Sequence, residues 1–191
     1  MKVFVMRKNF GSKPFLYPMP VLVIGSYDEN GVPNAMNAAW GAISDYTRIS
    51  ICVSSGHKTM KNIRERKAFT VSIADAKNVI AADYVGIVSG NKVPDKFENT
   101  GWHAVKSENV DAPIIEELPM TLECNMASYD EESEMLVGDI VNICADERVL
   151  SEDGKIDPTK LDPITYDPVN NTYLRLGQKV GEAFADGKNL K

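Results

Sequence analysis

Apolar and β-branched residues occur along this chain in short runs that are separated by turn-forming residues. The run Val21–Tyr27 reads as a buried strand and is followed by Asp28–Val32, which contains an Asn-Gly pair. That pair predicts a type I′ hairpin turn, because both central residues of this turn need positive φ. The returning strand is expected over residues 33–39. Arg48–Val53 and Ala68–Ile73 have the same character and predict two further strands.

Two longer alternating segments follow in the second half of the chain. Pro119–Ser128 and Glu134–Asp146 predict a pair of strands joined through a hairpin loop at Tyr129–Ser133. Many short strands with turns between them are typical of a sandwich or barrel. The pattern therefore predicts a mainly β fold, a β-barrel with a few helical additions.

Helical spacing is confined to two short segments. Lys58–Lys67 is polar and predicts a surface helix, with either Thr59 as its cap or Ser54–Ser55 bound at its mouth. Asn78–Val85 predicts a second helix with Gly86 as its stop. The segment Ser89–Gly101 is polar and predicts a long loop. Loops of this length are often functional, although a plain surface excursion is also common.

Proline punctuates both ends of the chain. Residues 9–20 contain three prolines and are expected to be extended or turning. Residues 151–168 are acidic and proline-punctuated, and Tyr173–Gly177 predicts a weak final strand. Such a tail cannot form a core of its own. We therefore expect a single domain over residues 1–191, with 151–191 packing as an extended tail on the barrel or on a partner subunit.

The composition is that of an ordinary globular protein of 191 residues, with 43% hydrophobic and 25% charged residues. A net charge of -6 argues against a nucleic-acid backbone or an anionic membrane as partner. Met1–Lys8 lacks the features of a signal peptide, and no apolar stretch approaches bilayer length. Cys52, Cys124 and Cys144 are scattered and odd in number. They predict free thiols, and a cytoplasmic location is expected.

Several kinds of active site are not indicated. His57 and His103 are the only histidines, and neither follows a GxSxG elbow. There is no paired CxxC spacing and no GxGxxG fingerprint, and the acidic run Asp130–Glu132 is typical of a solvated loop. The sequence therefore predicts no metal site, and it singles out no side chain as a catalytic acid, base or nucleophile.

Two neighbouring stretches do suggest chemistry. Hydroxyls, a glycine and a lysine at Ser54–Thr59 precede the first predicted helix, and helix N-termini attract phosphate. A capped surface helix would give the same pattern. Amides and small residues at Asn34–Ala39 lead to Trp40, which suits a flat ring, although a lone tryptophan is as easily a core or interface residue. Together they suggest a phosphorylated, ring-bearing cofactor.

At this point the ordered set of segments resembles the flavin reductase-like proteins with the FMN-binding split barrel, especially the flavoredoxin branch. The resemblance spans nearly the whole chain in the right order. It rests on Asn34–Gly41, Ser54–Ile63, Phe69–Ser72, Ser89–Phe97, Val137–Val141 and Pro163–Asp167.

The resemblance implies an FMN site that is built from three segments. One lines the ring and ribityl chain, a second binds the phosphate and a third is a cofactor-proximal loop. In this sequence they correspond to Asn34, Met36, Asn37, Ala38, Ala39 and Trp40, then to Ser54, Ser55, Lys58 and Thr59, and finally to Ser89, Gly90 and Lys92. Asn37 stands where many relatives have threonine. Val137-Gly138-Asp139 occupies the region where some relatives carry a histidine.

Two function classes follow from the resemblance. The first is an NAD(P)H-dependent flavin reductase that passes hydride to FMN. The alternative is a flavoredoxin-like, non-enzymatic electron carrier whose FMN exchanges electrons with another redox protein, and a plain FMN-binding module is a third possibility. The resemblance also implies a homodimer with each FMN near the subunit interface. It implies neither a nucleic acid nor a membrane as partner.

Overall fold

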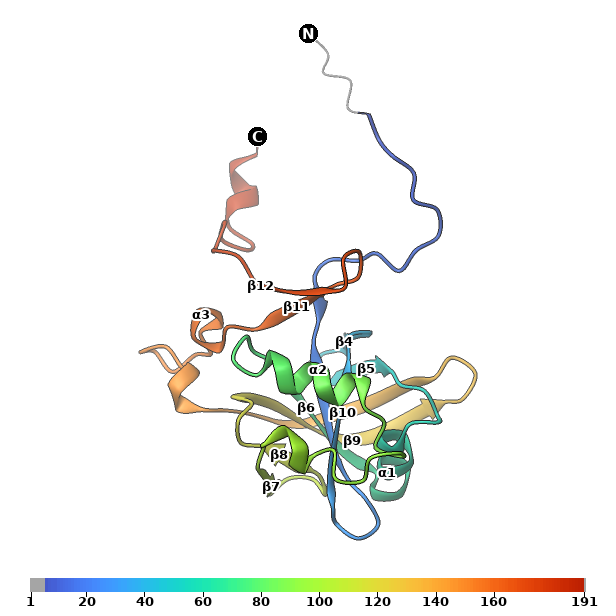
Figure 1. Ribbon diagram of the computed structural model, residues 1–191. Coiled ribbons are helices and arrows are strands. Elements are labelled where there is room, and N and C mark those ends of the chain that lie inside the picture. Colours follow the sequence, from blue (N-terminus) through green and yellow to red (C-terminus); the bar gives the residue numbers. More distant parts are fainter. Residues whose placement is uncertain (1–5, 191) are drawn as a thin grey trace.

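The computed structural model describes residues 6–190, so the first part of the N-terminal segment Met1–Lys8 lies outside the described residues. The molecule is built on a seven-stranded antiparallel sheet that curls into a half-barrel (Figure 1). In spatial order the strands are β3 (Pro33–Ala38), β2 (Leu22–Tyr27), β6 (Ala68–Ile73), β9 (Met120–Asp130), β10 (Met135–Ala145), β5 (Arg48–Cys52) and β4 (Gly41–Asp45).

The curl of the sheet follows from its connections. The outer strands β3 and β4 are consecutive in the chain and are joined only through Ala39 and Trp40. In a flat sheet of seven strands the outer two would be roughly 29 Å apart. The link from Ala38 to Gly41 reaches at most about 11 Å. The sheet must therefore bend until its two open edges face each other, and the Trp40 carbonyl accepts a hydrogen bond from the Cys52 N–H (2.8 Å) at this junction.

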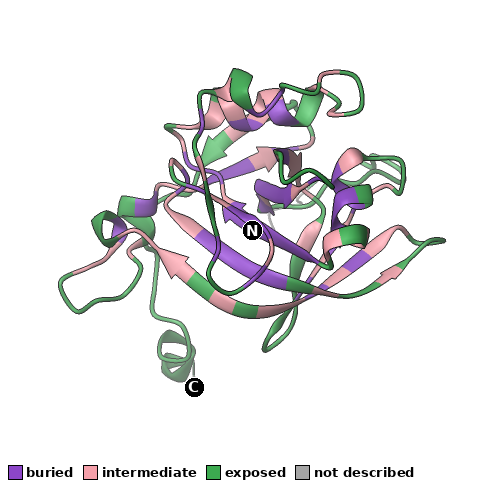
Figure 2. Ribbon diagram, turned by 90° about the horizontal axis from the view of Figure 1, so that it is seen from below, coloured by how far each residue is buried: buried purple, intermediate pink, exposed green. Residues whose placement is uncertain are grey.

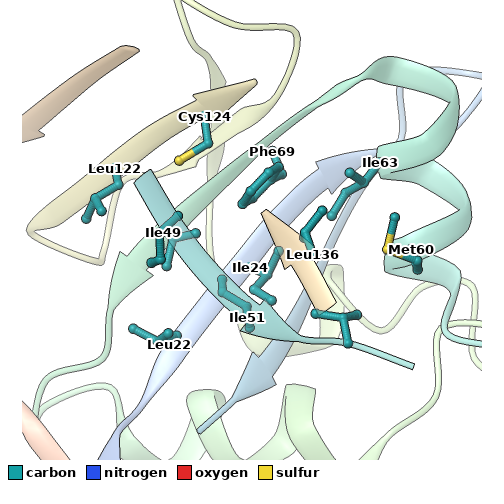
Figure 3. Packing of buried hydrophobic residues seen from close by; sticks show 12 residues of the cluster. Leu22, Ile24, Ile49, Ile51, Met60, Ile63, Phe69, Leu122, Cys124 and Leu136 are labelled. Atoms are coloured by element: carbon teal, nitrogen blue, oxygen red, sulfur yellow. The ribbon is translucent and has the colours of Figure 1, made fainter. Parts of the chain in front are cut away.

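One hydrophobic core fills the concave side of the sheet (Figure 3). Phe69 of β6 is fully buried and lies beside Gly138 of β10, where an added Cβ would come within 2.4 Å of the Phe69 ring. Only glycine allows this close approach. Further buried members of this core are Leu22, Ile24, Ile49, Ile51, Val53, Met60, Ile63, Val71, Leu122, Cys124 and Leu136.

A second core lies between the sheet and the helix α2 (Val79–Ile87). Val21, Val23 and Ala35 contribute from the sheet side, and Ala82 and Val85 from the helix. In the burial-coloured view, buried residues line the middle of the long strands, whereas the hairpin tips and the C-terminal segment are exposed (Figure 2). The strand β3 is consequently held between the two cores, although one of its edges has no partner strand among the described residues.

The first helix, α1 (Lys58–Arg66), closes one end of the barrel. Met60 and Ile63 are both fully buried and occur three residues apart, so they lie on one helix face. The helix ends where Lys67 adopts a left-handed conformation (φ 57°), and its last turn carries Arg64 and Arg66. This confirms the predicted surface helix, but Thr59 is not its cap: the N-cap is His57, which makes no side-chain capping bond.

The smaller elements attach the two ends of the chain to the barrel. β1 (Met19–Pro20), β11 (Ile164–Asp167) and β12 (Thr172–Arg175) form a separate three-stranded sheet. The remaining elements are β7 (Ala104–Lys106), β8 (Pro113–Ile115), α3 (Pro158–Leu161) and 3-10 helices at Glu98–Thr100, Glu147–Val149 and Asp186–Asn189. Among residues 6–190, no helix is long and apolar enough to cross a bilayer.

Besides the cap of α1, two local predictions were wrong. The turn after β2 is not type I′: the loop runs from Asp28 to Val32, and of its Asn-Gly pair only Gly31 takes positive φ (79°). The Asp28 carboxylate explains this longer loop, because it accepts hydrogen bonds from the N–H groups of Asn30 and Val32 (both 2.9 Å). Gly86 does not stop α2, which continues to Ile87.

Candidate functional site

A cavity of about 170 Å³ lies at the N-terminal end of α1. It is bounded by the helix mouth, by the start of β3 and by the loop that follows α2, three segments that are distant in sequence. We call it the helix-mouth cavity. Its lining residues are Asn34, Met36, His57, Lys58, Thr59, Val85, Gly86, Ile87, Val88, Ser89, Gly90 and Lys96.

Direct contacts hold the three segments of the helix-mouth cavity in place. The Asn34 amide donates to Thr59 Oγ1 (2.8 Å), which ties β3 to the first turn of α1. Gly90 packs against the same amide, since an added Cβ would lie 2.6 Å from Asn34 Oδ1. The Asn91 amide donates to the carbonyl of Gly56 (2.9 Å) and so connects the two loops. The cavity is thus already assembled in the folded chain.

The electrostatics of the helix-mouth cavity favour an anion. The first turn of α1 contains no acidic residue, and its backbone N–H groups give that helix end a partial positive charge. Lys58 adds a cation, which pairs with Asp28 (Nζ to Oδ2, 3.2 Å). Burial would raise the pKa of Asp28, but hydrogen bonds from Val32 and Lys58 outweigh it and hold the pKa below its ordinary value. Lys58 is therefore held near the cavity by a carboxylate that is ionised at neutral pH.

Lys96 is a second cation at this site. It is only 3% exposed, and its ammonium donates to the carbonyls of Val85 (3.0 Å) and Val88 (2.8 Å) at the C-terminal end of α2. Burial lowers its pKa from 10.5 to about 8. At neutral pH the side chain still carries its proton, and it lines the cavity beside the C-terminal end of α2.

Of the predicted contacts in the phosphate segment and the cofactor-proximal loop, three do not line the helix-mouth cavity: Ser54, Ser55 and Lys92. The Ser54 hydroxyl donates to Glu134 Oε1 (2.7 Å), and the Ser55 N–H points to the same oxygen (3.3 Å). Lys92 is exposed in a turn whose backbone N–H donates to the carbonyl of Ser89 (3.0 Å). Glu134 therefore occupies the serine donors that the sequence suggested for an anion.

A second cavity, of about 360 Å³, continues from the first along β3. The two share Gly86 and Ile87 as lining residues, and the second adds Asn37 and Ala39 from the predicted ring segment. We call it the hairpin cavity, because Tyr166, Asn171 and Tyr173 of the β11–β12 hairpin complete it.

The walls of the hairpin cavity are fixed by two hydrogen bonds. The Asn37 amide donates to the carbonyl of Ala82 (3.0 Å), and the Tyr173 hydroxyl donates to Asp83 Oδ1 (2.7 Å). Burial, reinforced by the Asp83 carboxylate, raises the pKa of Tyr173 to about 12. The phenol is therefore a neutral donor that clamps the C-terminal hairpin to α2.

A third, mainly apolar cavity of about 890 Å³ adjoins the hairpin cavity at Ala39. Trp40 forms part of its wall and is 58% exposed, and Phe15 and Leu16 of the N-terminal segment face it from the other side. We call it the apolar cavity. Of the predicted ring segment, Ala38 alone lines none of these three cavities, and its side chain packs against the barrel core. Only its backbone is then available to a ligand.

Sequence reasoning missed several residues at the site. Lys96 had no local signal, because a lysine in a polar loop gives no hint of burial. Asp83 and the tyrosines of the β11–β12 hairpin were missed because their contacts join positions that are distant in sequence. Among residues 6–190, no group of three or more His, Cys, Asp or Glu side chains is placed to hold a metal ion.

Comparison with known proteins identifies the family and similar folds. Residues 15–167 match the family model described as a flavin reductase like domain. The fold is similar to the flavoredoxin of Desulfovibrio vulgaris (Miyazaki F), with a TM-score of 0.91, 36% identity and coverage of 95% of this chain and 100% of that one. It is also similar to a flavoredoxin from Methanosarcina acetivorans, with a TM-score of 0.86, 29% identity and coverage of 99% and 100%.

A relative from Aeropyrum pernix, named only as an uncharacterized protein, is 28% identical over 118 residues. The match covers 61% of this chain and 44% of that protein, so this chain spans less than half the length of that relative.

Proposed function

The chain belongs to the flavin reductase-like family, and we propose that it is an FMN-binding flavoprotein that acts in electron transfer. The observation that carries this proposal is the helix-mouth cavity. Asn34, Lys58, Thr59, Ser89 and Gly90 come from three segments, and the family resemblance of the sequence assigns each segment to a cofactor. That they line one cavity supports a common ligand.

The residues present fit the phosphate of FMN. The helix N-terminus, the Lys58 ammonium and the Thr59 hydroxyl are donors suited to an anion. Gly90 lets its loop approach this site closely, because an added Cβ would lie 2.6 Å from Asn34 Oδ1. Lys96 is a further cation at the cavity wall. Ser54 and Ser55 remain part of the proposed site only if the Glu134 carboxylate releases them.

The ring would lie along the unpaired edge of β3. An edge strand presents backbone N–H and C=O groups that no neighbouring strand uses, and near Ala38 and Ala39 these groups face the seam of the barrel. Backbone donors there would hydrogen-bond the ring edge and stabilise its reduced, anionic form. When bound, FMN supplies the redox chemistry, and this chain supplies position and electrostatics.

Within this class we propose an NAD(P)H-dependent flavin reductase as the first function. The alternative is a non-enzymatic electron carrier, and it is favoured by the similarity to two proteins named flavoredoxin. Anaerobic mixing of the FMN-loaded protein with NADH and with NADPH separates the two. Rapid bleaching of the flavin absorbance supports the reductase, whereas no bleaching by either nucleotide supports the carrier.

Cofactor binding itself is tested by titration with FMN and with riboflavin, which lacks the phosphate. We expect FMN to bind more tightly than riboflavin. We expect Lys58→Met to reduce the ratio of the two affinities about tenfold, as is typical for the loss of one charge-assisted contact. Lys61→Met is the control, because Lys61 lies on the same helix but pairs with Glu29 and does not line the cavity. Equal affinity for the two flavins would contradict the proposed phosphate site.

We also infer that the protein acts as a homodimer in the cytoplasm. The dimer is what the family resemblance implies. A reducing compartment agrees with three free cysteines, of which Cys124 is buried and has its pKa raised to about 12 by that burial. Such a thiol stays protonated and unreactive.

A further inference from the structure

Both ends of the chain extend beyond the barrel on the same side of the molecule (Figure 1). The N-terminal arm consists of residues 6–18 and the C-terminal arm of residues 176–190. The two arms carry large apolar side chains that are exposed to solvent. These are Met6, Phe10, Phe15, Leu16 and Tyr17 on the first arm and Leu176, Val180, Phe184 and Leu190 on the second.

The exposed area of the chain is larger than a compact monomer would have. The chain exposes 12316 Å². A compact monomer of 21.1 kDa exposes about 9,000 Å², so the excess is roughly 3,000 Å². Stable interfaces bury about 1,200 to 2,000 Å² in total, and obligate homodimers bury more. The excess area is therefore sufficient for an intimate dimer of this chain.

The C-terminal arm has the chemistry of a segment that docks on an apolar surface. Its acidic groups are paired within the arm, since Lys179 forms an ion pair with Glu182 and the Asp186 carboxylate accepts from the Glu182 N–H (2.8 Å). Val180 and Phe184 are 102% and 97% exposed. The arm thus presents apolar side chains with few polar groups that docking would leave without partners.

The apolar cavity has the complementary surface. Its walls are mainly apolar and include Phe15, Trp40 and Met135, and its volume of about 890 Å³ can take more than one side chain.

We propose that in a pair of copies the C-terminal arm of each seats Val180 and Phe184 in the apolar cavity of the other and covers Trp40. In a two-fold dimer each copy then both gives an arm and receives one. The inference rests on the proposed homodimer and does not require FMN to bind. Because the apolar cavity adjoins the hairpin cavity at Ala39, the partner would close the ring end of the proposed FMN site.

The test uses Trp40 as a reporter in the FMN-free protein. The chain has two tryptophans, so Trp102→Phe leaves Trp40 as the only one. In this background we compare the full chain, a chain that ends at Gly177 and the double variant Val180→Ser/Phe184→Ser. Light scattering gives the oligomeric state, and acrylamide quenching reports the accessibility of Trp40.

We expect the full chain to be a dimer in which Trp40 is quenched severalfold less than in the two arm variants. The matched control is Val169→Ser, which alters an exposed valine outside the arm and should leave quenching unchanged. If Trp102→Phe does not fold, fluorine-labelled tryptophan in the otherwise unaltered chain reports Trp40 by its own resonance.

Three results would overturn the inference. If the chain is monomeric at all concentrations, there is no second copy whose cavity could receive the arm. A dimer in which Trp40 is quenched equally with and without the arm shows that the arm docks elsewhere. A monomer with Trp40 protected shows that the arm covers its own cavity. The first and third results also remove the proposed homodimer, whereas the second leaves it intact, and none of them bears on FMN binding.

Discussion

Replacing Lys96 with methionine tests how the chain accommodates a buried ammonium beside its proposed phosphate site. The substitution keeps most of the side-chain length and removes the charge together with the hydrogen bonds to Val85 and Val88. Two effects oppose each other at neutral pH. Relief of the burial penalty stabilises the variant by about 3 kcal/mol. The two carbonyls left without donors destabilise it by about 1 to 3 kcal/mol each.

Because these opposing terms are of similar size, the stability at neutral pH alone does not isolate the charge, and the dependence of stability on pH is the decisive quantity. The Lys96 pKa is about 8 in the folded chain and 10.5 for an ordinary lysine. Between these values the unfolded chain binds more protons than the folded chain, so stability rises with pH. From about pH 7 to about pH 10 the natural chain should gain about 2.5 kcal/mol relative to Lys96→Met.

Urea unfolding followed by tryptophan fluorescence at several pH values in this range measures the difference. Lys92→Met is the control, because Lys92 lies in the same loop and is exposed. Its stability difference from the natural chain should not change with pH. A Lys96→Met difference that is equally flat would refute the assignment of Lys96 as a buried, pKa-shifted cation.

Three further outcomes are expected. Gly90→Ala places a Cβ 2.6 Å from Asn34 Oδ1 and should weaken FMN binding about 5- to 150-fold in a calorimetric titration, because overpacking at that amide costs about 1 to 3 kcal/mol. Glu117→Gln should lower the pKa of His103, which the Glu117 carboxylate raises, and NMR of the ring protons measures it. The stability from this pair is present below the ordinary histidine pKa and is lost as pH rises through the raised value. Phe69→Ala should destabilise the barrel by about 3 to 5 kcal/mol in urea unfolding.

Matched variants decide each case. Gly154→Ala meets no other atom within 4 Å and lines none of the three cavities, so it should leave FMN affinity unchanged. Equal losses of FMN affinity in the two glycine variants would contradict the role of the close contact between Gly90 and Asn34. If the His103 pKa is the same in Glu117→Gln as in the natural chain, the proposed effect of the Glu117 carboxylate on His103 is wrong. Phe69→Leu keeps most of the buried volume and should lose less stability than the alanine variant. If it loses as much, cavity formation does not explain the effect.

The fold was predictable where a residue pattern is local. β2, β6 and α1 follow their predicted segments closely, because each carries buried apolar positions within one short stretch of sequence. β4 was missed because Gly41–Asp45 is largely exposed and has no apolar alternation to indicate a strand. The turn after Asp28 is not the predicted type I′ turn, because hydrogen bonds to the Asp28 carboxylate stabilise a longer loop than the Asn-Gly pair favours by itself.

The site was predictable in its segments but not in its contacts. Asn34, Thr59 and Gly90 belong to three separate stretches of the sequence, and the structure brings them together. The serines at 54 and 55 pair with Glu134, which is about 80 positions away and pairs with them only through the closure of β10 on β5. The Tyr173–Asp83 contact spans 90 positions for a similar reason. Such pairs depend on the topology of the sheet, which a single sequence does not encode locally.

Because only two residues link β3 to β4, a ligand that binds beside this link binds only the completely folded chain. The surfaces beside Ala39 and Trp40 exist only after all seven strands have closed, because β3 and β4 are the two ends of the sheet. A ligand at this seam has no partial site in an unfolded or half-formed chain. By mass action, FMN at about one hundred times its Kd would then raise the free energy of unfolding by about 2.7 kcal/mol. The fraction of the protein that is unfolded would thus depend on the concentration of free FMN.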